Sequence, residues 1–333
     1  MIAVQQPVAL VDAVDLLNEM LQIPSVSTPE AQLGQWLHRR LRGLGFAARR
    51  DEVGNVVAYW GSGPREVVLL GHLDTVPPRG PLAAAITAIT RQPARGGCRI
   101  TLVAAVGEGG SMRGARHLAT RRAPDALIAL EPSRWDGVMV GANGSLRLRY
   151  RFAQPAGHDV GSQASAADRA VAFIRRVQDH AVDWNQGRSF LDRLEARVLR
   201  FHADHDGMRD RASLTLGFRV PPGYDLDALR SRLDGWRESA DVSFDSAAVP
   251  IRTQTNTRLT RAFVEAIRQQ GGTPRLTVKD GTSEINILVP IWNCPAGAYG
   301  PGDSRLDRPA DEAIDIFELE KAVEVLTAVL KNL

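Results

Sequence analysis

Three segments of this chain each place an ionisable side chain directly after a run of apolar residues. VVLLGHLD ends in His72 and Asp74, VAAVGE ends in Glu108, and LIALE ends in Glu131. Imidazole and carboxylate groups are common zinc ligands, and a carboxylate can also take a proton from a zinc-bound water. The three segments therefore indicate the chemistry of a metal-dependent hydrolase.

Each of these side chains also has an ordinary structural explanation. A single His-x-Asp pair is a weak signal, Glu108 in GEGGS could be a solvated loop carboxylate, and Glu131 could cap the turn at EPS. Even within a metal site, Glu108 has two possible roles, as general base or as ligand. Placement of all three after apolar runs favours one shared site.

The elements that must position these residues are short buried strands alternating with helices. Such alternation predicts an α/β fold in which a mostly parallel sheet carries helices on both faces. Ligands of such sheets bind beyond the carboxyl ends of the strands. The ranges expected are strands at 66–70, 99–106 and 126–130, helices from Pro81 and at 113–120, and a hairpin at 47–60 before them.

A different pattern begins near Ser145. Strands that alternate polar and apolar residues are expected at 146–152, 213–220 and 242–251, with helices at 165–179 and 226–240 between them. This order resembles a ferredoxin-like α+β domain. We therefore expect one α/β domain, residues 1–142 and 254–333, interrupted by a smaller inserted domain, residues 143–253.

Composition sets wider limits on function. The 333 residues are 44% hydrophobic, enough for a full core, and no apolar run has the length of a membrane span. The formal net charge is only +3, and no basic recognition motif predicts binding to nucleic acid. Without a signal-peptide pattern, a cytoplasmic location is expected. Cys98 and Cys294 are expected to be buried thiols with no catalytic or ligand role.

Six motifs, taken together and in this order, resemble one known family across nearly the whole chain. They are LLGHLDTVP, AAVGEGGSMRGARHL, ALEPS, the GHD around His158, KDGTSEINI and AYGPGDSRLDRPADEAI. The chain is similar to the zinc-dependent aminoacylase and carboxypeptidase family, which includes acetylornithine deacetylase. Its segments EPSRWDG, GSLRLRYRF and GPGDSRLD look most like the members that release lysine or ornithine from an acidic amino-group carrier protein.

The resemblance implies a fold, an activity and a set of roles. It implies amide hydrolysis at a two-zinc site, in lysine or arginine biosynthesis, by a homodimer whose inserted domain is both lid and dimerisation domain. The implied substrate is an N-acylated basic amino acid. The implied roles are zinc ligands for His72 and Glu131, an orienting carboxylate for Asp74, oxyanion stabilisation for His158, and substrate contacts for Arg219, Gly281, Thr282 and Ser283.

The chain departs from the family pattern at three positions of this site. The aspartate that bridges two zinc ions is absent from the short segment after Pro77. Glu108 is followed by Gly109 where the family has paired glutamates. Arg308 stands where a zinc-binding histidine is expected, and a guanidinium stays protonated and does not ligate metals.

These departures leave two interpretations open. In the first, at most one zinc ion is held by His72 and Glu131, with Glu108 as third ligand or as base. In the second, Arg308 replaces the missing cation by pairing with Glu131 or Glu108, and the site is free of metal. The function expected is release of lysine or ornithine, and the alternative is a catalytically impaired or shortened variant that only binds the carrier or the amino acid.

Overall fold

The computed structural model describes residues 11–23, 30–74, 80–93, 97–156, 163–304 and 313–333. The chain divides into two compact units. The first unit comprises 1–141, 253–279 and 283–333, and the second comprises 142–252 and 280–282. Their catalytic and lid roles stay predictions, and we describe each unit by itself.

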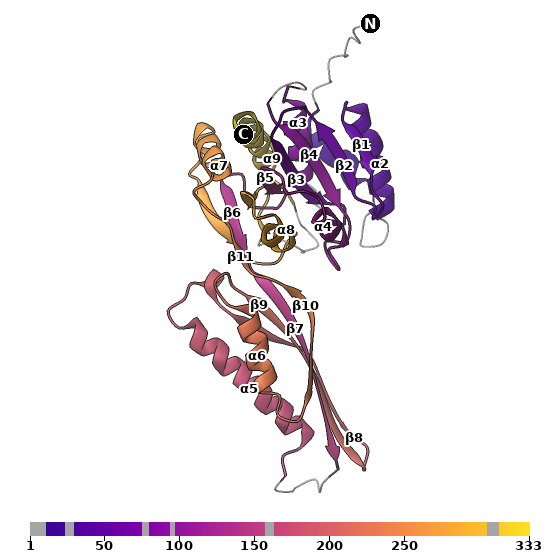
Figure 1. Cartoon of the computed structure of the whole chain (residues 1–333), viewed down its shortest axis with the longest axis vertical. Coiled ribbons are helices and arrows are strands. Elements are labelled where there is room, and N and C mark those ends of the chain that lie inside the picture. Colours follow the sequence, from indigo (N-terminus) through magenta and orange to yellow (C-terminus); the bar gives the residue numbers. More distant parts are fainter. Residues whose placement is uncertain (1–10, 24–29, 75–79, 94–96, 157–162, 305–312) are drawn as a thin grey trace. The chain divides into compact units, whose positions relative to one another are not determined.

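The first unit is built on a mixed sheet whose centre is parallel (Figure 1). The strand order is β1-β2-β4-β3-β5-β13-β6, and β12 pairs with β6. β3 is parallel to both β4 and β5, and β5 is parallel to β13, whereas the β1–β2 and β2–β4 pairs are antiparallel. The strands are β1 (Ala47–Arg50), β2 (Val56–Trp60), β3 (Glu66–His72), β4 (Arg99–Ala105), β5 (Ala126–Ala129), β6 (Gly137–Ala142), β12 (Arg275–Lys279) and β13 (Ala296–Ala298).

Helices pack around this sheet and complete its hydrophobic core. Every residue of α3 is buried, because this helix packs against α1 and α9 as well as against the sheet. The helices of the first unit are α1 (Ala13–Leu21), α2 (Glu30–Gly43), α3 (Gly80–Thr90), α4 (Arg113–Leu118), α7 (Arg258–Gln269), α8 (Ile285–Trp292) and α9 (Ile316–Asn332). Among the described residues, no helix combines the length and apolar character that spanning a membrane requires.

The second unit is a four-stranded antiparallel sheet, ordered β10-β7-β9-β8, with its own core beneath α5 and α6 (Figure 1). A capping box at Ser165 and Asp168 starts α5. The elements are β7 (Gly144–Pro155), α5 (Ala166–Asn185), a 3₁₀ turn (Phe190–Asp192), β8 (Glu195–His205), β9 (Arg209–Val220), α6 (Leu226–Gly235), β10 (Asp241–Ala248) and the short β11 (Ile251–Arg252).

The expected fold class is confirmed, and the sequence analysis missed several elements. β8 was not predicted because most of its residues are exposed, so its sequence lacks an alternation of polar and apolar residues. α8 is short, apolar and contains Pro290, which argues against a helix. β6, β12 and β13 were also missed, and the helix expected over 226–240 ends at Gly235.

Candidate active site

The ionisable residues singled out in the sequence lie at one edge of the central sheet. His72 is the last residue of β3, Glu108 follows β4, and Glu131 follows β5. Since these three strands are adjacent and parallel, their carboxyl ends meet at the same edge. Each of the three titratable groups lies close enough to affect the pKa of another.

The ring of His72 is oriented by a backbone carbonyl group. Its Nδ1 lies 2.7 Å from the carbonyl oxygen of Asp74. Because a carbonyl oxygen only accepts, Nδ1 donates this bond, which leaves Nε2 for a ligand or a proton. The side chain of Asp74 was expected to orient His72. Instead, it accepts hydrogen bonds from the backbone N–H groups of Glu108, at 2.9 Å, and Gly109, at 3.0 Å.

Two buried carboxylates hold the loop that carries Glu108. Besides Asp74, the side chain of Glu30 accepts from the N–H of Gly107 at 3.1 Å and pairs with Arg113 at 2.7 Å. Gly107 has a φ of +75°, and a Cβ there would lie 2.9 Å from an Arg113 nitrogen. Only glycine suits this backbone conformation well. Glu30 had no distinguishing signal in the sequence.

Glu131 forms a buried ion pair that the sequence analysis did not foresee. Lys279, the last residue of β12, places Nζ 2.5 Å from Glu131 Oε2, and the two residues are 9% and 3% exposed. Glu131 Oε1 is buried without a hydrogen-bond partner. Lys279 is the first residue of the KDGTSEINI motif, and this position was the one feature of the sequence that could have indicated its role.

Glu284 is a second residue that the sequence analysis missed. It precedes α8, is 1% exposed, and its Oε1 has no hydrogen-bond partner. Burial raises the pKa of Glu284, the charge of His72 opposes that effect, and Glu131 and Glu108 raise it further, to about 7. A carboxylate that belongs to a charge cluster is typical of a functional site.

The other titratable groups of the cluster respond to the same excess of negative charge. Burial lowers the pKa of His72, but the charges of Glu284, Glu108 and Glu131 outweigh it and raise the pKa to about 9. Burial raises the pKa of Glu108, and the charge of His72 opposes that shift. The site therefore favours a cation or a proton.

This cluster contains donor atoms of the kinds that bind zinc. His72 Nε2 and the unpartnered oxygens of Glu131 and Glu284 are nitrogen and oxygen donors of the type that zinc takes. Within the described residues, however, no three His, Cys, Asp or Glu side chains are arranged to hold a metal. Zinc binding would therefore require these side chains to move.

The predicted substrate residues lie in two places. Arg219 pairs with Glu195 at 2.5 Å and with Asp280, and its guanidinium stacks over Phe190, all within the second unit. Gly281 and Thr282 belong to the same unit. Ser283 belongs to the first unit and is fully buried, and its N–H donates to Asn286. His158, Arg308 and the segment after Asp74, 75–79, lie outside the described residues.

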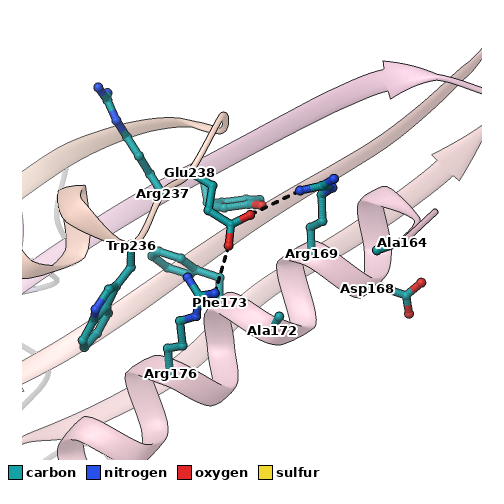
Figure 2. Close-up of a pocket in the computed structure, with 10 residues that line it drawn as sticks. Ala164, Asp168, Arg169, Ala172, Phe173, Arg176, Trp236, Arg237 and Glu238 are labelled. Carbon is teal, nitrogen blue, oxygen red and sulfur yellow. Dashed lines mark hydrogen bonds and ion pairs between the residues drawn. The ribbon is translucent and has the colours of Figure 1, made fainter. Parts of the chain in front are cut away.

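A pocket of about 200 Å³ in the second unit contains none of these residues (Figure 2). It lies between α5 and the segment after α6. The carboxylate of Glu238 bridges Arg169, at 3.2 Å, and Arg176, at 2.9 Å. Because the charges at its centre are paired with one another, we do not take this pocket as the active site.

Comparisons with known proteins show which family this chain resembles. Residues 68–332 match the sequence family described as peptidase family M20/M25/M40. The chain is 34% identical to LysW-lysine hydrolase of Deinococcus radiodurans, over 96% of both chains. It is 32% identical to the putative LysW-lysine/LysW-ornithine hydrolase of Thermococcus kodakarensis, over 97% of this chain and 92% of the relative.

Solved structures of low sequence identity share the fold. Aminopeptidase PepT of Bacillus cereus aligns with a TM-score of 0.79 at 17% identity, over 96% of this chain and 97% of that chain. An M20 family metallo-carboxypeptidase of Sulfolobus solfataricus aligns with a TM-score of 0.75 at 15% identity, over 97% and 99% of the two chains.

Proposed function

We propose that this chain, which belongs to peptidase family M20/M25/M40, hydrolyses the amide bond that links lysine or ornithine to an acidic amino-group carrier protein. The observation that carries the proposal is the meeting of His72, Glu108 and Glu131 at the carboxyl ends of adjacent strands. The names of the relatives support the substrate, since one is named a LysW-lysine hydrolase and another a putative LysW-lysine/LysW-ornithine hydrolase.

In this mechanism, Glu108 takes a proton from the attacking water and returns it to the leaving amine. Its burial supports the role, because a raised pKa brings a carboxylate closer to the range in which it can exchange protons near neutral pH. The hydrogen bonds that Asp74 accepts from the Glu108 loop hold this base in position. Lys279 would contribute positive charge beside the negative charge that develops on the carbonyl oxygen.

The proposed cofactor is at most one zinc ion. His72 Nε2, with oxygens of Glu131 and Glu284, would hold it. Bound zinc supplies Lewis-acid polarisation of the amide carbonyl. This assignment is supported by the donor types and by the two unpartnered carboxylate oxygens.

The remaining assignments extend the proposal beyond the cluster. The second unit is the lid and dimerisation unit of a homodimer, and His158 stabilises the oxyanion. Arg219, Gly281, Thr282 and Ser283 contact the substrate. These roles are supported by the family resemblance of their motifs.

The experiment is to incubate the purified chain with carrier protein loaded with lysine and with carrier protein loaded with ornithine, with zinc added, and to measure free amino acid. We expect steady release that His72→Ala abolishes and that Glu108→Gln lowers by about 10²–10⁴-fold. His38→Ala is the matched control, because His38 binds the carbonyl oxygen of Ala48 in another part of the unit. Absence of turnover with every divalent metal tested would exclude the proposal.

A second candidate function is binding of the loaded carrier without hydrolysis. The pairing of Lys279 with Glu131 favours it, because this contact occupies an oxygen of a predicted zinc ligand. A zinc-independent complex with the carrier, together with no release of lysine, would support this function. Steady hydrolysis would rule it out.

A further inference from the structure

The contact between Lys279 and Glu131 joins two nearly inaccessible side chains of opposite charge. Nζ and Oε2 are 2.5 Å apart, and β12, paired with β6, fixes the backbone of Lys279. We propose that Lys279 is a built-in cation of the active site, whose ammonium group occupies one oxygen of Glu131 and limits the site to a single divalent metal ion. This proposal rests on the proposed function only in taking the cluster around Glu131 as the active site.

The first reason is the space around Glu131 Oε2. Zinc lies about 2.0–2.2 Å from a carboxylate oxygen that binds it. The ammonium nitrogen already lies 2.5 Å from Oε2 and takes up acceptor capacity that a metal ion would need. Only Oε1, which has no hydrogen-bond partner, remains available. Glu131 can therefore give one oxygen to a metal while Lys279 holds the other.

The second reason is repulsion between cations in a buried site. Like charges a few ångströms apart repel much more strongly in a protein interior than in water. Lys279 and Glu131 are 9% and 3% exposed, so little solvent screens them. A second metal ion would be repelled by the fixed charge of Lys279. In the family pattern, a bridging aspartate neutralises part of the charge of the two metal ions, and that aspartate is absent from this sequence.

The third reason is that the ammonium group neutralises Glu131 when no metal is bound. A buried carboxylate without a counter-charge is costly. Arg308 was the cation that the sequence suggested for this role, and it lies outside the described residues. Lys279 makes the contact directly. It comes from a different part of the chain, 148 residues from Glu131 in sequence.

The test is zinc binding to the whole chain after metal removal, measured by calorimetry and by native mass spectrometry. Lys279→Met removes the charge and keeps much of the side-chain volume, and Lys279→Arg is the control that keeps the charge. We expect about one zinc ion or none per wild-type chain. We expect Lys279→Met to bind zinc at least about tenfold more tightly or to gain a second ion, because the repulsion is gone. Lys279→Arg should behave as wild type.

Two results would overturn the proposal. One is two tightly held zinc ions in the wild-type chain, a measurement that needs no variant. The other is a Lys279→Met variant that folds, as judged by circular dichroism, but binds zinc no better than the wild-type chain does. Should Lys279→Met not fold, Lys279→Gln provides the same comparison. Because zinc is measured without substrate, failure of this inference and failure of the proposed hydrolysis give different results.

Discussion

At the scale of single residues, the excess of buried carboxylates makes the stability of the zinc-free protein depend on pH. The pKa of Glu284 is raised to about 7 and that of His72 to about 9 in the folded chain. A raised pKa means that the folded state binds its proton more tightly than the unfolded state, so stability is greatest at low pH and falls as pH rises. The stability that Glu284 contributes is lost between about pH 4.5 and pH 7, and the stability that His72 contributes is lost between about pH 6.5 and pH 9.

We therefore expect the melting temperature of the chelator-treated protein to fall between pH 6.5 and pH 9, measured by scanning calorimetry. Glu284→Gln should flatten this fall, because it removes one titrating group and a carboxylate that raises the pKa of His72. Glu320→Gln, at an exposed position of α9, is the control and should leave the profile unchanged. A melting temperature that does not change with pH in the wild type would contradict the account.

Glu30 provides a second prediction at this scale. Its carboxylate is 5% exposed and holds both the Gly107 N–H and Arg113. Glu30→Ala should lower the free energy of unfolding by about 1–3 kcal/mol, because a buried N–H loses its partner. The exposed pair of Glu19 with Arg40 is the matched control, and Glu19→Ala should cost about 0–1 kcal/mol. Urea denaturation measures both, and equal costs would show that Glu30 does not support the loop.

At the scale of elements, the packing of α4 against the end of β4 shapes the loop that carries Glu108. The Gly114 N–H donates to the carbonyl oxygen of Val106, and Asn55 binds both the carbonyl oxygen of Gly114 and the N–H of Val106. A Cβ on Gly114 would lie 2.3 Å from Asn55 Oδ1 and 2.6 Å from the Val106 nitrogen. A substitution there must move the helix away from the strand.

Gly114→Ala should therefore destabilise the chain by about 1–3 kcal/mol and lower hydrolysis as well, because the Glu108 loop shifts with α4. Gly110→Ala is the control in the same loop, since a Cβ there meets no atom within 4 Å. Thermal unfolding and amide hydrolysis would be measured on both variants. Gly114→Ala with wild-type stability and activity would contradict the packing described.

Prediction from sequence succeeded for the elements with a clear hydrophobic pattern. The continuous apolar runs of β3, β4 and β5 marked strands buried on both faces, and their order fixed which edge carries His72, Glu108 and Glu131. Lys279 and Glu284 were not found because their roles depend on β12 and α8. Neither of these short elements has a distinctive period, and both reach the site only through long-range packing.

At the scale of the whole molecule, the chain has two hydrophobic cores, one in each unit. Phe263 is fully buried in the first core and Leu148 in the second. Separate cores allow unfolding in more than one step. Calorimetry should show two transitions. Phe263→Ala should lower the free energy of unfolding of the first unit and Leu148→Ala that of the second, each by about 2–5 kcal/mol. A single transition that both variants shift equally would show that the two cores unfold as one.

The central claim is that the cluster at the sheet edge removes lysine or ornithine from a carrier protein. The most direct measurement is the intact mass of a loaded LysW carrier before and after incubation with the chain. The account predicts that the carrier loses the mass of the amino acid with the wild-type chain and keeps it with Glu108→Gln. A carrier that stays loaded with the wild-type chain, at every zinc concentration, would contradict it.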